Sequence, residues 1–574
     1  MGRLIKHKTI KVTILLCFLN ILVYGQVNVN TLDAIPRETV HLSHNANTFL
    51  VGETLYYNFY SLIENNKPSS ISKIGYVELI GQDGDFLFNH KLKLDEGLGS
   101  GDYFIPADIE TGQYKLIAYT KWMKNEDAVF ISDVYIINPF LKHSNIQDTK
   151  SIAISKSKNS AVNSKPIEPT GITIETNSES LKPRRLSSIR LTTNNVDLYN
   201  GNYALSVRKI SPLEIKNNST VEGENIIKLI DSSNTLPELR GEIISGTVKN
   251  KSNDSLVRNA VVSLSIPGKE FILKNVKTNN SGRFYFSLSE NYTSTDVLIQ
   301  VIDKTTNSEY KIVLDNPEVY DFTNLRFESV YLNPNLKDWL TTTSKYTQIE
   351  NAYFNSKKDS IINRLPSSLF YVEPDVEYVL DDYKRFPTLK ETFVEIIQSG
   401  AIRKSKGSLK FKVLEDQTSY YSGYDPLVLF DGILIQNNED IMNYDARNIE
   451  RISILSDTYF YGPSVYYGII DIKTKNGDFV LEGNADNKIY LNLDAPLNSK
   501  LFYSPKYDTE LTAFNRIPDY RKQLLWLPKL VMDTNSKNIE FYTSSVTGTY
   551  EIVLEGFTLS GKHVVIKKTI DVKD

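Results

Sequence analysis

The chain has 574 residues, with 65 Lys and Arg against 69 Asp and Glu and a formal net charge of −4. This near balance, without a basic block, argues against nucleic acid as a partner. At roughly 100–200 residues per domain, the length predicts several domains. Tyr, Thr and Ile are abundant and favour strands. We therefore expect a mainly β protein, with antiparallel β-sandwiches in series and one small α+β domain.

The N-terminus has the three regions of an export signal. Basic residues within positions 3–11 precede an apolar run at 12–23, and Gly25 offers a small residue for cleavage. The run is shorter than the roughly 20 apolar residues that span a bilayer, and a short buried helix fits the three regions less well. We predict a signal peptide at 1–25 and an exported protein that is not itself integral to the membrane. Its expected location is the periplasm, the outer membrane or the cell surface.

The positions of the cysteine and the histidines limit the metal sites that the chain is expected to form. Cys17 is the only cysteine and lies inside the predicted signal, so the mature chain is expected to have no disulfide, thiolate ligand or lipid-bearing cysteine. Of the six histidines, only His41 and His44 are close in sequence, on a predicted strand where positions three apart face opposite sides. We predict no metal site and no cofactor.

Residues 26–140 alternate apolar and polar side chains in short runs, as in Thr54–Tyr60 and Tyr114–Thr120, with turn signals such as Asp83-Gly84 between them. This pattern predicts an antiparallel sandwich.

The same segment resembles the macroglobulin-like domain of the alpha-2-macroglobulin superfamily. The resemblance rests on Phe49–Leu55, Ile105-Pro106 and Thr111–Leu116. Members of that superfamily that trap proteases use an internal thioester, which needs a cysteine, so that chemistry is not expected here.

Residues 141–170 are rich in Ser, Lys and Asn and are predicted to be a linker. Short strands such as Ile172–Thr176 and Tyr203–Arg208 then predict a second small sandwich at 171–232.

Residues 238–315 resemble the carboxypeptidase regulatory-like, transthyretin-like sandwich. The resemblance rests on Ile243–Val248, Ala260–Leu264 and Thr278–Phe286, with Gly282 expected at positive φ in the turn. It implies a spacer module without catalytic residues.

Residues 316–384 are irregular and are treated as a connector. A helix signal follows: Thr388 and Glu391 form a capping box, apolar residues of 389–397 share one face, and Gly400 ends the helix.

Residues 385–478 resemble the plug domain of TonB-dependent outer-membrane transporters. The resemblance rests on Leu427–Phe430 with the Asp431-Gly432 turn, on Ile449–Leu455 and on Tyr461–Lys475. These strands are apolar on both faces, so the helix, neighbouring domains or a partner must cover them. The sequence after Gly477 is too short for a transporter barrel with strands of about 9–11 residues. Two interpretations stay open: one more structural domain, or a module that docks against an outer-membrane barrel.

Residues 479–574 are predicted to be a C-terminal macroglobulin-like β domain. Leu525–Pro528 and Val546–Tyr550 are similar to the tail of plug-bearing exported proteins in Bacteroidota, and Trp526 is expected to be a core or interface anchor.

No nucleophile elbow, phosphate loop or zinc-helix motif occurs in the sequence. Carboxylate pairs such as Asp381-Asp382 lie in polar stretches, where a solvated surface explains them better than acid–base catalysis. A glycosidase site built from distant carboxylates stays an alternative. We predict that the protein is not an enzyme and has no catalytic residues.

The predicted function is protein–protein contact, as an accessory to an outer-membrane transporter or translocon through the plug-like region. The expected partner is an outer-membrane β-barrel or another envelope protein, and the candidate contact residues are Tyr459, Phe460, Tyr461 and Tyr466. The alternatives are a free-standing surface scaffold or adhesin, and a thioester-less protease-binding macroglobulin relative.

Overall fold

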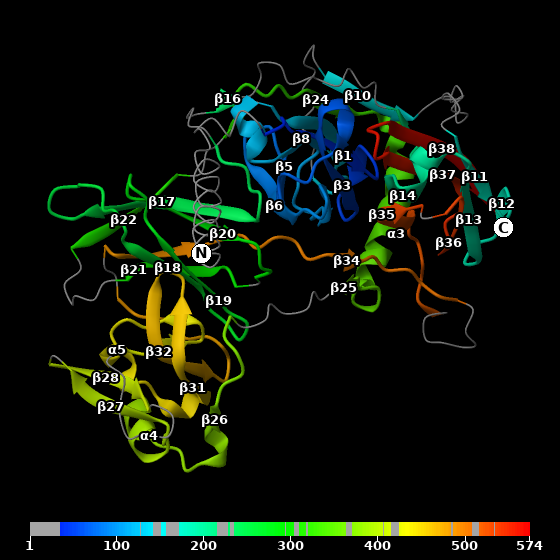
Figure 1. Ribbon diagram of the computed structural model, residues 1–574. Helices are drawn as coiled ribbons and strands as arrows, with labels where there is room; N and C mark the ends of the chain where they lie inside the picture. The colour runs from blue at the N-terminus through cyan, green and yellow to red at the C-terminus, as the bar shows by residue number, and fades with distance from the viewer. Residues whose placement is uncertain are drawn as a thin grey trace, which may run out of the picture.

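The computed structural model describes most of the chain, and the predicted signal peptide at 1–25 lies outside the described residues. The described ranges are 35–126, 128–141, 151–156, 171–214, 228–229, 235–292, 294–302, 309–316, 320–362, 370–405, 407–414, 424–483, 486–507, 516–532 and 534–574. The predicted fold class is confirmed, because the elements are mostly strands in antiparallel sheets (Figure 1).

The first sandwich packs two sheets over one core. One sheet has the order β1-β3-β4 with β7 on β3, and the other has the order β2-β9-β8-β5-β6. Leu55 and Phe59 of β3 meet Leu116 of β8 and Val134 of β9 in a core from which water is excluded. The bounds are β1 Thr39–His44, β2 Thr48–Leu50, β3 Thr54–Ile63, β4 Lys67–Pro68, β5 Ile74–Ile80, β6 Phe86–Lys93, β7 Leu98–Phe104, β8 Gly112–Tyr119 and β9 Phe130–Ile137.

A second sandwich, here called the composite sandwich, is built from two segments that are distant in sequence. Its sheets have the orders β11-β13-β36 and β12-β38-β37-β14-β35. In Figure 1 the teal strands β13 and β14 accordingly lie beside the orange-to-red strands β35–β38. The bounds are β11 Ile172–Thr176, β12 Ser180–Leu181, β13 Leu186–Thr193, β14 Asn202–Lys209, β35 Gln523–Val531, β36 Ser536–Tyr542, β37 Gly548–Phe557 and β38 His563–Val572.

The expectation of separate domains at 171–232 and 479–574 is therefore wrong. β13 alternates buried and exposed residues along its whole length, so one face needs a covering sheet. The covering residues Ile552 and Leu554 come from β37, and they pack with Ile189 and Leu191 of β13 and Leu205 of β14. The first segment alone has too few strands to enclose this core.

The third sandwich corresponds to the segment predicted as regulatory-like, with one added strand. Its sheets have the orders β20-β17-β22 and β19-β18-β21-β33. β33 comes from within 479–574, so that segment is divided between two sandwiches. Gly282 has φ +66°, as the turn signal predicted. The bounds are β17 Glu242–Asn250, β18 Val261–Ile266, β19 Ile272–Lys277, β20 Arg283–Leu288, β21 Asp296–Ile302, β22 Tyr310–Leu314 and β33 Lys488–Asn492.

The plug-like unit is a mixed sheet of order β26-β31-β32-β29-β30 with a β27-β28 hairpin and two short helices. β29 is parallel to β32, and the other pairs in the sheet are antiparallel. β26 precedes residue 385, so the predicted boundary omitted one strand. The bounds are β26 Val376–Val379, α4 Leu389–Glu395, β27 Gly400–Ser405, β28 Ser408–Val413, β29 Leu427–Phe430, β30 Ile433–Leu434, α5 Glu439–Met442, β31 Ile449–Tyr461 and β32 Ser464–Thr474.

Local signals explain the start of α4 and the β29–β30 turn. The expectation that Gly400 ends the helix is wrong, because α4 ends at Glu395 and Gly400 begins β27. The Thr388 hydroxyl accepts a hydrogen bond from the Glu391 N–H at 3.2 Å, as the capping box predicted. Asp431 and Gly432 have φ of +47° and +85°, the pair of positive values that a type I′ hairpin turn requires. The buried Asp431 carboxylate accepts hydrogen bonds from the Thr474 N–H and hydroxyl at 2.8 and 2.6 Å and thereby ties the turn to β32.

The connector and the predicted linker contain more regular structure than expected. The 16-residue helix α3 (Lys337–Ala352) lies in the connector. Within the predicted linker, β10 (Ser151–Lys156) pairs with β24 (Ser329–Leu332) and β15 (Leu213–Glu214), because its extended backbone completes their hydrogen bonding. The remaining short elements are α2 Val196–Tyr199, β16 Lys228–Leu229, β23 Tyr320–Asp321, β25 Ser360–Ile361 and β34 Lys500–Leu501. None of the helices in the described ranges combines the length and apolar composition needed to cross a membrane.

Candidate functional site

The four aromatic residues predicted as a contact surface lie at the far end of the β31–β32 hairpin. The strand register pairs Tyr459 with Tyr466 and Phe460 with Val465. Phe460 is 75% exposed, whereas Tyr459, Tyr461 and Tyr466 are partly buried. The structure therefore brings the four side chains to one hairpin end but turns only Phe460 fully to solvent.

Two of the partly buried tyrosines hold the hairpin to the rest of the protein. The Tyr459 hydroxyl donates to the carbonyl oxygen of Phe370, and the Tyr461 hydroxyl donates to that of Leu273 in β19. The Tyr461 and Phe370 rings are 4.2 Å apart. Since these groups are used within the chain, the four rings do not form one exposed patch. The exposed apolar surface at this tip is Phe460 with its neighbour Val465.

Both faces of the plug-like sheet are covered by the chain itself. On one face, Ile452 and Ile470 pack in a core with Phe393 of α4 and Ile441 of α5. On the other face, Leu429 and Ile469 pack against Leu273 of β19 and against Phe271, the residue just before this strand of the third sandwich. Figure 1 shows this arrangement, with the yellow plug-like unit directly below the green third sandwich.

The edge strand β30 is also fixed to the third sandwich through its backbone. Gln300 of β21 donates its side-chain amide to the Leu434 carbonyl oxygen at 2.8 Å, and the Leu434 N–H donates to the Ser265 hydroxyl at 3.3 Å. An edge that is hydrogen-bonded in this way does not offer those groups to another strand.

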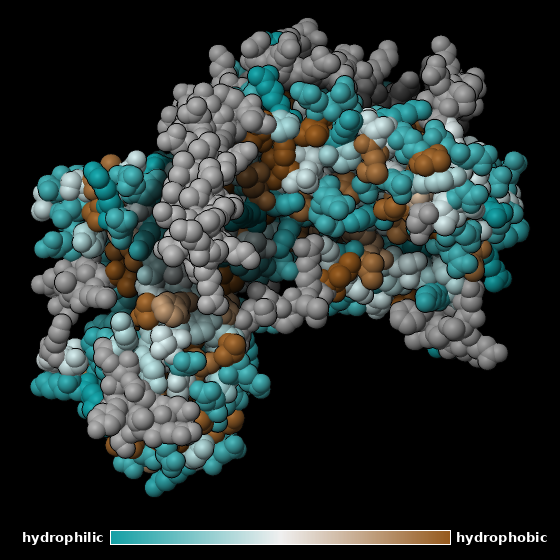
Figure 2. Space-filling model, viewed as in Figure 1, coloured by the Kyte–Doolittle hydropathy of each residue, from teal (hydrophilic) through white to brown (hydrophobic). Residues whose placement is uncertain are grey.

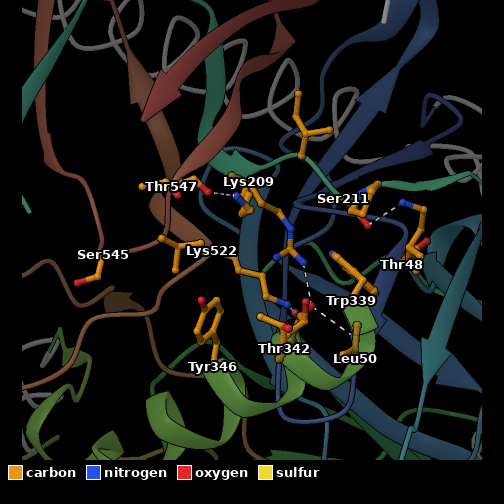
Figure 3. Close-up of a pocket in the computed structure, with 17 residues that line it drawn as sticks. Thr48, Leu50, Lys209, Ser211, Trp339, Thr342, Tyr346, Lys522, Ser545 and Thr547 are labelled. Atoms are coloured by element: carbon orange, nitrogen blue, oxygen red, sulfur yellow. Dashed lines mark hydrogen bonds and ion pairs between the residues drawn. The ribbon is translucent and has the colours of Figure 1, made fainter. Parts of the chain in front are cut away.

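A pocket of about 200 Å³ lies between the first sandwich, the composite sandwich and α3 (Figure 3). The first sandwich contributes Thr48, Leu50 and Glu53. The composite sandwich contributes the residues around the end of β14 and the start of β35, and α3 contributes an aromatic wall that includes Trp339 and Tyr346.

A buried charge cluster forms part of the pocket wall. The Lys522 ammonium donates to one Glu53 carboxylate oxygen, and Arg208 donates to the other at 3.0 Å. The side chains of Glu53, Arg208 and Lys522 are only 9%, 15% and 17% exposed. Burial raises the pKa of Glu53, but the charges of Lys522 and Arg208 together with its hydrogen bonds outweigh that effect and hold it below its usual value. Glu53 is therefore ionised at neutral pH and joins two cations across the interface.

Lys209 adds a further positive charge to the pocket. Its ammonium donates to the Thr547 carbonyl oxygen, and it lies 5.5 Å from the centre of the Tyr550 ring. Burial, followed by the nearby Lys522 charge, lowers the pKa of Lys209. Glu53 is the one acidic residue among the described lining residues, so the pocket carries an excess of positive charge. This charge favours an anionic or strongly polar group as an occupant.

The pocket offers binding groups rather than an activated nucleophile. Its hydroxyls come from residues such as Ser211, Ser545 and Thr547, and the described lining contains no histidine or cysteine to act with them. Sequence reasoning missed this site, because Glu53, Arg208 and Lys522 are each unremarkable in their local sequence. The pairing of β14 with β35 and the packing of the first sandwich against them bring the three residues together.

No protein-family model matches the chain. No curated protein matches it either.

Among solved structures, the chain is similar to trypsin-activated alpha-2-macroglobulin from Escherichia coli, with 9% identity over 94% of this chain and 42% of that one, and a TM-score of 0.24. Salmonella alpha-2-macroglobulin reacted with methylamine gives 9% identity over 94% and 40%, with a TM-score of 0.23. The Yersinia pseudotuberculosis adhesin InvE gives 11% identity over 48% and 58%, with a TM-score of 0.13. The chain spans less than half the length of the two macroglobulins. These TM-scores are below 0.5 and do not establish a shared fold.

Proposed function

We propose that the protein is a non-enzymatic, exported envelope protein that acts through protein–protein contacts as a free-standing β scaffold. The observation that carries this proposal is the coverage of the plug-like sheet. A sheet whose two apolar faces are packed by α4, α5 and β19 of the same chain does not need a barrel wall to exclude water.

The interleaved strands support the same conclusion. The composite sandwich needs β35–β38, and the third sandwich needs β33, so the chain returns to earlier units after completing the plug-like unit. Because strands from the C-terminal segment complete two earlier sandwiches, the sandwiches and the plug-like unit form one body and are not independent domains joined by flexible linkers. A fixed body is suited to presenting several surfaces at set distances.

The face of the molecule drawn in Figure 2 is suited to contacts of limited size. Figure 2 shows separate hydrophobic areas within a mostly hydrophilic face. Scattered apolar residues of this kind are ordinary on soluble surfaces. The positively charged pocket beside α3 provides a more specific candidate contact, for an acidic group of a protein partner.

A second candidate function is that of an accessory protein, which binds an outer-membrane transporter or translocon through the plug-like unit. The observation that favours it is the exposure of Phe460 at the hairpin tip, since an exposed aromatic ring is a common anchor in protein interfaces. This contact would use the tip of the β31–β32 hairpin rather than a face of the sheet.

Chemical cross-linking in intact cells, followed by purification of the tagged protein in mild detergent, separates these functions. The variant Phe460→Asp removes the exposed ring. Val394→Asp is the matched control, because Val394 is 67% exposed on α4 of the same unit.

The scaffold function predicts cross-linked protein partners that both variants retain, without a β-barrel at one-to-one stoichiometry. A β-barrel recovered at one-to-one that is lost only in Phe460→Asp would establish the accessory function instead. Recovery of no cross-linked partner would overturn both.

A further inference from the structure

Two histidines and a glutamate from distant parts of the chain converge where the first sandwich meets the composite sandwich. His41 lies on β1, Glu555 on β37 and His563 on β38. The Nε2 atom of His41 is 2.9 Å from Oε1 of Glu555, and Nε2 of His563 is 3.3 Å from the same oxygen. The three ligand atoms all lie within 4.8 Å of one another.

The strand pairing explains why Glu555 and His563 meet. In the β37–β38 hairpin, Phe557 is directly opposite His563, so Glu555 is two residues further along and faces the same side. Diagonal neighbours of this kind are within reach of long side chains. His41 then enters from the first sandwich, 514 residues before Glu555.

The chemistry of the cluster matches a divalent metal. Two imidazole nitrogens and one carboxylate oxygen form a ligand set that zinc uses, with water in the fourth position. Metal–ligand distances of about 2.0–2.2 Å place tetrahedral ligand atoms about 3.3–3.5 Å from one another. The separations of 2.9 and 3.3 Å from Glu555 Oε1 are near these values, and the two histidine nitrogens lie within 4.8 Å of each other.

All three groups contact neighbouring residues, and the His563 ring stacks on the Phe557 ring with centroids 4.7 Å apart. The His41 ring lies 5.7 Å from the Phe130 ring and 5.3 Å from the Phe557 ring. The backbone of Glu555 is fixed by the Tyr60 hydroxyl, which donates to the Glu555 carbonyl oxygen at 3.1 Å. His41 and Glu555 are 27% and 22% exposed, whereas His563 is 39% exposed and leaves a path for an ion to enter.

His44, the other histidine of β1, is engaged elsewhere. Its Nδ1 is 2.8 Å from the Ala46 carbonyl oxygen, and its Nε2 is 3.0 Å from the Ser132 hydroxyl. In the sequence, His44 is the only histidine near His41, whereas Glu555 and His563 lie more than 500 positions further along the chain.

We propose that His41, Glu555 and His563 bind one Zn²⁺ ion, with water as the fourth ligand. The ion joins β1 of the first sandwich to the β37–β38 hairpin of the composite sandwich. The bound ion holds these two sandwiches together. This role is independent of the partner that the protein binds.

Isothermal titration of tag-free, chelator-treated protein with ZnCl₂ tests the proposal. The expected result is a stoichiometry of one, with affinity reduced at least tenfold in His563→Ala and in Glu555→Gln. Glu551→Gln is the matched control, because Glu551 faces the same side of β37 but is paired with Lys567 at 3.2 Å. This control should bind zinc like the wild type.

Two further measurements distinguish loss of a zinc ligand from loss of folding. Circular dichroism of the metal-free variants should match the wild type, since His563 is near the surface. Co²⁺ in place of Zn²⁺ should give the visible absorption of a four-coordinate site in the wild type but not in His563→Ala. Absence of one-to-one zinc binding in the wild type, or equal binding in both ligand variants, would overturn the proposal.

Discussion

Replacing Glu53 by Gln should weaken the attachment of the first sandwich to the composite sandwich. The substitution keeps the shape of the side chain but removes the charge that Arg208 and Lys522 share. Removing one partner of a buried ion pair costs about 3–5 kcal/mol, because the other charge stays buried without compensation. Since the Gln oxygen still accepts one hydrogen bond, we expect a loss of about 3 kcal/mol at pH 7.

The loss of stability caused by Glu53→Gln should be smaller at acid pH than at pH 7. The pKa of Glu53 in the folded protein lies below its usual value of 4.5. Its ionised form therefore stabilises the folded state fully above about pH 4.5, and this contribution is lost as the pH falls through the folded-state pKa. The difference in stability between the wild type and Glu53→Gln should accordingly narrow below pH 4.5.

Urea unfolding followed by tryptophan fluorescence measures this difference. Two of the three tryptophans report on the interface, since Trp339 lines the pocket and Trp526 stacks on Tyr56 at 5.9 Å. Asp95→Asn is the control, because the Asp95–Lys529 pair joins the same two sandwiches but is 66% and 53% exposed. An exposed pair contributes at most about 1 kcal/mol. A loss below about 1 kcal/mol for Glu53→Gln, or one that does not narrow in acid, would refute the reasoning.

Other substitutions test how the plug-like unit packs against the third sandwich and which of its residues are exposed. Gly432→Ala should destabilise it by about 1–3 kcal/mol in urea unfolding, because φ is +85° and a Cβ would lie 2.1 Å from Phe271 Cβ; wild-type stability would contradict the turn geometry. Phe271→Ala should cost about 3–5 kcal/mol and speed proteolysis between this unit and the third sandwich, whereas an unchanged digestion pattern would argue against their packing. Phe460→Asp should change stability by less than about 0.5 kcal/mol, and a larger drop in the thermal midpoint would show that Phe460 is buried.

Local sequence signals predicted the elements whose cause is local. The strands β3 and β14, the cap at Thr388 and the turn at Asp431-Gly432 each depend on residues within a few positions of one another. The sequence left the helix, neighbouring domains or a partner as alternatives for covering the plug-like strands, and the structure places α4 on one face and β19 on the other.

Strand partners could not be predicted in the same way. A period of two shows that one face of β13 is buried, but it does not show that β37 covers that face from more than 350 positions later in the sequence. The pairing of β14 with β35 brings Arg208 and Lys522 together, and the packing of the first sandwich on the composite sandwich brings Glu53 to them and His41 to Glu555. Trp526 was expected to be a core or interface anchor, and it is 5% exposed against the first sandwich.

Hydrogen–deuterium exchange of the purified protein, without membranes or a barrel, tests the central claim most directly. If the chain covers its own plug-like sheet, the amides of β29 and of the Ile469–Ile472 part of β32 should exchange as slowly as those of β8 in the core of the first sandwich. Rapid exchange of β29 and β32 that slows only when an outer-membrane barrel is added would contradict the account and favour docking into a barrel.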